Sequence, residues 1–578
     1  MVPVAAGWLT KVTLDQLSAG AETRLLLMLS VGLALAGVVQ AVVPLVMGYL
    51  QAELERAIGI LAQERLFTAV GRFVGLAPFE DPTFLDKLRL ARQSGRTATN
   101  HVVNGTLGVA RASVTIIGFV VSLFALAPLM AVFVLGFALP VMVAEIALSR
   151  RRAAMLWRIS PRERRELFFD QLLSSVDAAK EVRLFGIGSF LLGRMQVERQ
   201  AANAARRLLD RRELSTQSLL ALLAAVVSGV GLVWVIHGAL TRSLSFGDVA
   251  IFIAAVAGVQ AATAQLAADM ARAHQALTLF AHYQEVITRE PDLRCATDPH
   301  ALPPLAHQIE LRDVWFRYEE DQPWILKGVD LVIPWGRSMA VVGLNGAGKS
   351  TLVKLLCRFY DPTRGAILWD GVDIRDVDPG DLRQRISAVF QDFMHYDLTA
   401  RENIALGDLT ALEDTPRVME AAQKAGVHEA ISRFPQRYDT LVTRIFFPST
   451  DEDDSSPGVL MSGGQLQRLA LARALVRDGR DFMILDEPAS GLDAEAEHEL
   501  HQNLREFHKG QTRILISHRL GSVRDADQIV VLSDGRIVER GDHAGLMLRK
   551  GDYARLFTLQ AAGYVKELDT PPPQQVRL

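Results

Sequence analysis

Cysteine is nearly absent from this sequence, since Cys295 and Cys357 are the only two in 578 residues. Both stand far from any metal-ligand spacing, so we interpret them as free thiols in a reducing compartment. A surplus of one charge is also lacking, because the net charge is −3, and nucleic acid is therefore not an expected partner. The N-terminus lacks the basic start of a signal peptide, and the first long apolar run begins only after Arg24.

Charge is scarce within five long apolar runs in the first half of the chain. Hydrophobic residues make up 49% of the sequence and charged residues 22%, a mixture typical of a chain divided between membrane and water. Each run can supply the ~20 residues that cross a bilayer as a helix. Five such runs fit the buried helices of a soluble protein poorly. We therefore predict five membrane spans, at residues 25–50, 112–126, 129–149, 217–236 and 248–268.

Basic residues predict the orientation of these spans. They are frequent in segments 51–103 and 150–213, whereas the connection at Ala127-Pro128 has none and 237–247 has one. The two basic segments, which are helical in pattern, are expected in the cytoplasm. Counting back through five spans places the N-terminus outside. The basic run 150–152 is interpreted as the flank of a span, with binding of lipid head groups as the alternative.

A glycine-rich segment follows the strand predicted at residues 339–342, with the sequence Gly343-Leu344-Asn345-Gly346-Ala347-Gly348-Lys349-Ser350. It matches the P-loop pattern in its expected setting, between a strand and a helix. The glycines let backbone N–H groups surround phosphate oxygens, and the helix N-terminus adds positive potential. We expect Lys349 to reach the β- and γ-phosphates of ATP and Ser350 to ligate Mg²⁺. The residues predicted to bind ATP here are Gly343, Asn345, Gly346, Gly348, Lys349, Ser350 and Thr351.

Two carboxylates, Asp486 and Glu487, end the apolar run 482–485, which we predict to be a buried parallel strand. Ligands bind at the carboxyl ends of the strands in such sheets. With a P-loop upstream, we expect Asp486 to hold Mg²⁺ and Glu487 to polarise the attacking water.

A third motif is Met461-Ser462-Gly463-Gly464-Gln465. Together with the P-loop and Asp486-Glu487, it resembles the signature motif of ABC transporters. The resemblance implies that this segment contacts, from a helix N-terminus, the γ-phosphate of an ATP molecule held on another subunit. Met461 stands where the family usually has leucine, a mild change in side-chain shape. The residues implied in this contact are Ser462, Gly463, Gly464 and Gln465.

The remaining motifs of the ABC family occur in their usual order. The resemblance implies that Tyr318, with Phe316 as a rival, stacks on adenine, and that Gln391 touches Mg²⁺. It also implies that Asp493 communicates across a dimer and that His518 lies near the γ-phosphate. The implied catalytic residues are Glu487, His518 and Lys349, and the implied metal ligands are Ser350, Gln391 and Asp486.

The predicted fold is multidomain, with an α-helical transmembrane bundle followed by an α/β P-loop ATPase domain. We expect a transmembrane domain at 1–285, a linker at 286–307, an ABC ATP-binding domain at 308–562 and a disordered, proline-rich tail at 563–578. This order resembles that of exporter-type half-transporters and, more loosely, actinobacterial multidrug- and peptide-type exporters. Segments 76–81 and 180–186 resemble the coupling regions of that fold.

The resemblance implies a dimer in the cell membrane that uses ATP hydrolysis to export a cargo. The partner is expected to be a second half-transporter subunit, in a homodimer or a heterodimer, with the spans in lipid and the ATPase domains in the cytoplasm. An importer of the same fold and an ATP-driven membrane module that moves no cargo are the alternatives. The uncharged spans favour an apolar or amphipathic drug, lipid or peptide. A polar patch suits helix–helix hydrogen bonding at least as well as cargo binding, and consists of Gln260, Thr263 and Gln265.

The chain departs from the family pattern in two places. Exporters of this fold have six spans per half, and five are found here. We expect residues 1–20 to correspond to the end of the first span and its outer loop, so that the chain starts within that helix. The acidic run 451–454, before the signature, is interpreted as a solvated loop, with pairing to the basic cytoplasmic helices as the alternative.

Overall fold

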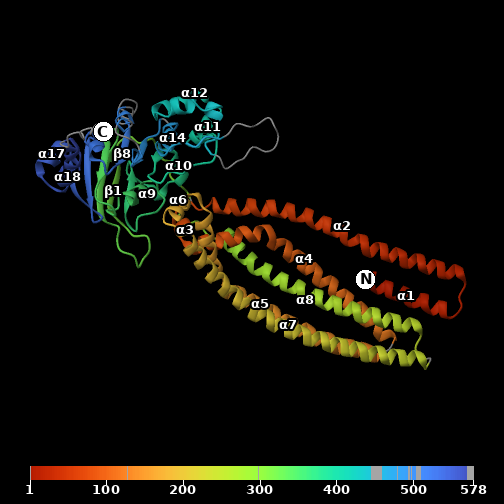
Figure 1. Cartoon of the computed structure of the whole chain (residues 1–578). Coiled ribbons are helices and arrows are strands. Elements are labelled where there is room, and N and C mark those ends of the chain that lie inside the picture. The colour runs from red at the N-terminus through yellow and green to blue at the C-terminus, as the bar shows by residue number, and fades with distance from the viewer. Residues whose placement is uncertain are drawn as a thin grey trace, which may run out of the picture. The chain divides into compact units, whose positions relative to one another are not determined.

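The computed structural model divides into two compact units, each described by itself (Figure 1). The helical unit contains Met1–Arg72 and Asp81–Glu290, and the sheet unit contains Phe73–Glu80 and Pro291–Leu578. The short segment 73–80 therefore belongs with the second half of the chain. The structure describes residues 2–126, 128–241, 243–296, 298–443, 458–477, 479–491, 495, 497–500, 502 and 510–568.

The helical unit is built of long helices. The longest has 53 residues and extends roughly 80 Å at 1.5 Å per residue, far more than the ~30 Å thickness of a bilayer core. A helix satisfies its own backbone groups, so an apolar chain can stay helical through lipid and beyond it. The helices are α1 (Val2–Ser18), α2 (Thr23–Val70), α4 (Pro82–Leu126), α5 (Pro128–Ser174), α6 (Val176–Leu184), α7 (Gly188–Leu240) and α8 (Phe246–Thr288).

Four helices of the described part are long and apolar enough to cross a membrane, namely α2, residues 103–125 of α4, α7 and α8. They include four of the five predicted spans. The fifth, at 129–149, lies in α5, where many side chains fall outside the described residues. The predicted turn at Ala127-Pro128 lies between the end of α4 and the start of α5.

Helix α1 packs beside the beginning of α8. Lys11 forms ion pairs with Asp248 at 2.6 Å and Asp15 at 3.0 Å, and Asp15 accepts a hydrogen bond from the Gly247 amide at 2.9 Å. A turn at residues 19–22 then leads into α2. Counting spans from the sequence placed the start of α2 at the outer end of the bundle. Because residues 2–18 add a helix before α2, the turn at 19–22 lies at that end.

Close helix packing in this unit depends on small residues and on single polar contacts. A Cβ atom on Gly258 of α8 would lie 2.2 Å from the Phe119 ring of α4, so only glycine permits this approach. In the predicted polar patch, Gln260 donates to the Ser228 hydroxyl of α7 at 3.1 Å, and Thr263 donates to a carbonyl of its own helix. The Gln260 contact agrees with the helix–helix interpretation of that patch, whereas the Thr263 bond stays within α8.

Three ion pairs connect α5 and α7 in the unit's basic extensions. Arg165 pairs with Glu198 at 3.1 Å, Glu166 with Arg199 at 2.9 Å, and Glu163 with Arg206 at 2.5 Å. Each helix supplies both acids and bases, and Glu163, the first member of the set on α5, pairs with Arg206, the last on α7. We call these three pairs the α5–α7 ladder. Its charges favour one antiparallel register over neighbouring ones.

The sheet unit contains a six-stranded sheet in the order β10-β9-β3-β8-β7-β6 and a four-stranded sheet in the order β2-β1-β4-β5. The five strands from β9 to β6 are parallel, and their apolar runs are buried as expected for a sheet covered on both faces. The strands are β1 (Gln308–Phe316), β2 (Leu326–Pro334), β3 (Ser338–Val342), β4 (Arg364–Trp369), β5 (Val372–Asp373), β6 (Ile386–Val389), β7 (Phe482–Asp486), β8 (Thr512–Ile516), β9 (Gln528–Ser533) and β10 (Arg536–Gly541).

Helices divide this unit into two cores. One core joins both sheets around α9, with Trp369, Leu352 and Ile484 among its members. The other joins α11, α12 and α14 beside β7, with Ile404 and Leu471 at its centre. The helices are α3 (Ala77–Glu80), α9 (Lys349–Leu356), α10 (Pro379–Gln384), α11 (Ala400–Ala405), α12 (Thr415–Lys424), α13 (His428–Ser432), α14 (Gly463–Leu475), α16 (Leu520–Val523), α17 (His543–Arg549) and α18 (Asp552–Leu568).

Two predicted boundaries differ from the helices of the structure. Helix α8 continues to Thr288, into the predicted linker, and the linker residues Leu302 and Leu305 are buried in the first core. Helix α18 continues to Leu568, beyond the predicted start of the tail at 563, because the first helix-breaking proline comes only at Pro571.

Candidate functional site

The predicted site residues converge because four adjacent parallel strands end at one edge of the six-stranded sheet. Strand β3 runs into the P-loop, β7 ends at Asp486, β8 is followed by His518, and β6 is followed by Gln391. Their registers align these ends, since Asp486 lies opposite Ile516 and Leu485 lies opposite Val389. The carboxyl edge of a parallel sheet is where ligands bind in α/β folds.

The P-loop is shaped by glycines in left-handed backbone conformations. Gly346 has φ +81° and Gly348 has φ +106°. A Cβ atom on Gly343 would lie 2.2 Å from the Leu532 carbonyl oxygen, and one on Gly348 would lie 2.8 Å from Leu326. Asn345 is exposed at the outer part of the loop. The loop then leads directly into the N-terminus of α9, so its amides and the helix end can face one anion.

Lys349 begins α9 and turns back over the loop. Its ammonium donates to the carbonyl oxygens of Gly343 at 2.9 Å and Leu344 at 3.0 Å. Burial lowers the pKa of this ammonium, and the nearby carboxylates Glu487 and Asp486 act in the opposite direction. A cation held in this way is available to phosphate oxygens once a nucleotide enters.

Asp486 fits the role of a Mg²⁺ ligand. Burial raises the pKa of its carboxyl to about 6, and the neighbouring charge of Glu487 adds to this shift. A buried carboxylate with a carboxylate neighbour is stabilised by a cation. Among the described residues, no group of three His, Cys, Asp or Glu side chains could hold a metal alone. One carboxylate, the exposed Ser350 and phosphate oxygens form the kind of set that Mg²⁺ accepts.

Glu487 has an unusual backbone conformation for a residue other than glycine, with φ +51°. Its amide donates to the Ile516 carbonyl of β8 at 2.8 Å. Its carboxylate, only 11% exposed, lies 2.9 Å from Nδ1 of His518. The structure therefore brings together the predicted catalytic glutamate and the predicted histidine.

The two candidate aromatic residues differ in burial. Phe316 is 3% exposed and belongs to the first core, where it cannot present a face to a ligand. Tyr318 is half-buried, and its hydroxyl lies 3.2 Å from the Thr351 hydroxyl just after the P-loop lysine. The adenine role that the sequence left between these residues is therefore assigned to Tyr318 in the proposal below.

The signature motif forms the start of α14. Ser462 is the N-cap, its hydroxyl accepts a hydrogen bond from the Gln465 amide at 3.3 Å, and the Gln465 side chain accepts one from the Ser462 amide at 2.9 Å. This capping box leaves Ser462 and Gly463 exposed and Gly464 half-exposed. Met461, the departure from leucine, is buried in the second core.

Several important contacts were not identified from the sequence. Glu80 of α3 forms an ion pair with Lys354 of α9 at 2.7 Å and accepts a hydrogen bond from the Tyr360 hydroxyl at 2.5 Å. Lys354 in turn lies 5.3 Å from the centre of the Tyr318 ring. We call Glu80, Lys354, Tyr360 and Tyr318 the α3 cluster. It connects the coupling-like segment 76–81 to the candidate nucleotide site.

Segment 73–80 is further attached through backbone groups. Asp292 accepts from the amides of Val74 and Gly75, each at 3.1 Å, and Arg383 donates to the Val74 carbonyl at 2.7 Å. Arg358, which is fully buried, donates to three carbonyl oxygens in two other segments, those of Arg294 and of Arg375 and Val377. Buried arginines that bind backbone carbonyls carry no motif, so only the fold reveals them.

Two predicted features lie outside the described residues. They are Asp493 and the acidic run 451–454.

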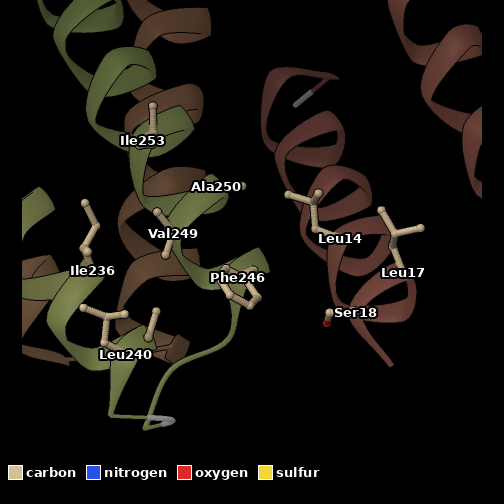
Figure 2. A pocket seen from close by; sticks show the side chains of 10 residues that line it. Leu14, Leu17, Ser18, Ile236, Leu240, Phe246, Val249, Ala250 and Ile253 are labelled. Carbon is tan, nitrogen blue, oxygen red and sulfur yellow. The ribbon is translucent and has the colours of Figure 1, made fainter. Parts of the chain in front are cut away.

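The helical unit contains an apolar cavity of about 550 Å³ between α1, α7 and α8 (Figure 2). Side chains from all three helices line it, including Leu14, Ile236, Phe246 and Ile253. Ser18 is the single polar side chain among the lining residues. Such a lining accepts hydrocarbon and disfavours a charged group.

Comparison with known proteins shows what the segment with the candidate site is similar to. Residues 326–490, which contain the P-loop, the signature and Asp486-Glu487, match the family model described as ABC transporter. The segment that carries the candidate site is thus similar to the ATP-binding domains of ABC transporters. The fold of the chain is that of a bacterial Atm1-family ABC exporter solved with ATP bound, with a TM-score of 0.76, 24% identity and coverage of 97% of both chains. The predicted fold class is thereby confirmed, and the matched family model agrees with the resemblance to ABC transporters.

Curated relatives match this chain over part of their length. An ATP-dependent lipid A-core flippase of Chromohalobacter salexigens is 38% identical over 341 residues, which are 58% of this chain and 56% of that protein. A putative multidrug export ATP-binding/permease protein of Bacillus subtilis is 41% identical over 253 residues, which are 44% of this chain and 41% of that protein. The chain matches between 41% and 56% of the length of these two curated relatives.

Proposed function

We propose that this chain is one half of a dimeric exporter that couples ATP hydrolysis to the movement of an apolar or amphipathic cargo across a membrane. The observation that carries the proposal is the convergence of the P-loop, Gln391, Asp486-Glu487 and His518 at one sheet edge, on a chain that also contains membrane-length helices. Relatives named as a lipid flippase and a multidrug exporter support the direction and the class of cargo.

In this proposal ATP binds along the carboxyl edge of the sheet. Adenine stacks on Tyr318, and the glycine-rich loop and α9 N-terminus surround the phosphates. Lys349 exchanges its two loop carbonyls for phosphate oxygens. Mg²⁺, held by Ser350, Asp486 and Gln391, supplies neutralisation of phosphate charge when it is bound.

Hydrolysis depends on how Glu487 is held. Its carboxylate orients the attacking water, and His518 fixes that carboxylate from the other side at 2.9 Å. The exposed start of α14 presents Ser462, Gly463 and Gly464 to the ATP of a second subunit. Asp493 keeps its predicted role in communication across the proposed dimer. Closing such a dimer adds contacts only in the ATP-bound state, so ATP shifts the population of the membrane helices.

The proposed location is the cell membrane, with the ATPase domain in the cytoplasm. The basic segments 51–103 and 150–213 support this orientation. For the cargo, the apolar cavity between α1, α7 and α8 supports a hydrocarbon group over a charged one.

The test is ATP hydrolysis by the purified full chain in lipid, beside Glu487→Gln. We expect the wild-type chain to hydrolyse ATP and the variant to bind it with little turnover. Wild-type activity that persists in Glu487→Gln would contradict the proposed site. Inactivity of both would mean that this chain alone does not form the shared sites.

Direction is tested in inside-out vesicles with a fluorescent short-chain phospholipid and an apolar dye as probes. Export predicts ATP-dependent accumulation or flipping that Glu487→Gln abolishes. Ala250→Trp, which fills the cavity, should reduce transport while ATP hydrolysis remains. ATP-dependent release from these vesicles would instead indicate import.

A further inference from the structure

Gln467 is a buried amide that the sequence motifs do not assign. It lies on α14, two residues after the signature, and is 3% exposed. Its Nε2 donates to the Glu487 carbonyl oxygen and to the Ser490 hydroxyl, each at 3.1 Å. Its Oε1 accepts from the Gly491 amide at 2.7 Å. Both ends of the side chain therefore bind the segment that carries the proposed catalytic glutamate.

This segment is held in a conformation that needs support. A left-handed φ of +51° at Glu487 is unfavourable for a residue with a Cβ atom, and persists only where the surroundings impose it. Strand β8 fixes the Glu487 amide through the Ile516 carbonyl. Gln467 fixes the carbonyl on the other side of the same residue.

The fit between Gln467 and the following turn is close. A Cβ atom on Gly491 would lie 2.8 Å from the Gln467 side-chain oxygen, so the turn approaches this amide more closely than a side chain would allow. Because Gln467 is buried and fully paired, a change in its position must move one of its partners.

We propose that Gln467 is a positioning residue for ATP hydrolysis, holding Glu487 in its left-handed conformation and connecting it to the signature helix. This inference depends on the proposed function. There, the start of α14 contacts ATP on the partner subunit, while Glu487 serves the ATP on its own subunit. When the dimer closes, a shift of α14 is transmitted to Glu487 through the buried amide of Gln467. Each ATP site therefore becomes competent for hydrolysis when the other site holds ATP.

The experiment compares Gln467→Glu and Gln467→Met with the wild-type full chain in lipid. Gln467→Glu keeps the shape and the acceptor for Gly491 but loses the donor to Glu487. We expect kcat to fall roughly 10- to 100-fold, since misplacement of a reacting group by about 1 Å costs about that much, while the KM for ATP changes less than about threefold. The Hill coefficient for ATP should fall toward one.

Ser387→Ala is the matched control. Ser387 is 1% exposed and donates to the Ala474 carbonyl of the same helix at 2.7 Å, but it has no contact with Glu487. Its loss should destabilise α14 with little change in kcat. Ser490→Ala, which removes one of the two acceptors of Nε2, should give an intermediate kcat.

Two results would overturn the inference. One is a kcat and a Hill coefficient in Gln467→Glu equal to those of the wild type, and the other is an equal loss in Ser387→Ala. Amide hydrogen exchange of residues 487–491 gives a readout that does not need activity, and it should accelerate in Gln467→Met. Unchanged exchange would also reject the positioning role, whereas a wild-type chain that hydrolyses no ATP would count against the proposed function.

Discussion

At the scale of single residues, burial decides which aromatic side chain can meet the base of ATP. Tyr318 is half-buried beside the P-loop, whereas Phe316 lies in the core. We predict that Tyr318→Ala raises the KM for ATP about tenfold, because stacking on a base contributes about 1–3 kcal/mol. Tyr318→Phe keeps the ring and should stay within about threefold. Phe316→Leu, the control, should lower the melting temperature and leave the KM unchanged. A larger effect of Tyr318→Phe would mean that the hydroxyl, not the ring, binds ATP.

The raised pKa of Asp486 predicts that Asp486→Asn stabilises the protein without nucleotide and destabilises it with Mg-ATP. Its folded-state pKa of about 6 lies above the ordinary 3.8, so the folded state holds an extra proton between these values and loses stability as the pH rises through them. At pH 8 without nucleotide, Asp486→Asn should therefore unfold at a higher temperature. The gain should be on the order of 3 kcal/mol, since the pKa is raised by about two units and one unit is worth about 1.4 kcal/mol.

With Mg-ATP present the wild type should unfold at a higher temperature than Asp486→Asn, because only the carboxylate binds the metal. Thermal unfolding at pH 8 and at pH 5, with and without Mg-ATP, checks both signs. A variant that is less stable than the wild type in all four conditions would contradict this account.

The role of a residue could be predicted from the sequence where the residue belongs to a motif. Lys349, Asp486 and Glu487 stand in patterns whose chemistry is clear without coordinates. Gln467, Glu80 and Arg358 could not be found in this way, because their roles depend on which carbonyl or cation lies opposite them in space.

At the scale of elements, the α3 cluster predicts a route from the coupling segment to the nucleotide. Hydrogen bonds from Lys354 and Tyr360 lower the pKa of Glu80 despite the opposing effect of burial, so this carboxylate is charged at neutral pH. We predict that Glu80→Ala retains ATP hydrolysis and loses its stimulation by transported probe. Glu80→Lys combined with Lys354→Glu should restore part of that stimulation. Glu310→Ala, which breaks the exposed pair with Arg312, is the control and should have no effect.

The α5–α7 ladder predicts a charge-dependent helix register. Glu163→Arg places two like charges together and should destabilise the pairing by about 0.5–1 kcal/mol, as for exposed ion pairs. The exchange Glu163→Arg with Arg206→Glu should recover that loss. Thermal unfolding in lipid at low and high salt measures both, and the difference should shrink at high salt. Breaking the Glu53–Arg56 pair within α2 is the control. Equal losses in the single and double variants would exclude a specific contact.

Most elements could be predicted from their patterns, but their ends could not. Apolar runs indicated the spans, and the helical pattern of the two basic segments predicted that the helices continue past them, as α7 does; alanine, leucine and arginine continue the helix where no lipid is needed. The helix at residues 2–18 was expected as the end of a span, and its packing against α8 depends on Lys11, Asp15 and Asp248, which are far apart in the chain.

At the scale of the whole molecule, the proposed dimer predicts that defective and intact subunits interact. We consider an equal mixture of wild-type and Glu487→Gln chains that assort randomly into dimers. About half of the activity would remain if each site works independently, and about a quarter if a dimer needs two intact sites. We expect the lower value. Activity should be measured after co-expression, with each chain separately tagged, and a residual near one half would indicate sites that act alone.

The two-domain order could be predicted from composition, because long apolar runs occur in the first half of the chain and not in the second. The membership of residues 73–80 could not, since a short segment between two helices carries no compositional signal. Its place depends on Asp292, Arg383 and Glu80, three contacts that cross more than two hundred residues of sequence.

Segment 73–80 has a consequence for engineering hybrid transporters. A chimera that exchanges the ATPase halves of two half-transporters at the linker would keep this segment from the parent that supplies the membrane half. The incoming half would then meet a foreign peptide at Asp292, Lys354, Tyr360 and Arg383. Transplanting eight residues along with the linker-to-tail half would keep the interrupted domain whole, since both parts belong to one compact unit. A compatible ATPase half therefore consists of two separate pieces of sequence, one of which lies between membrane helices.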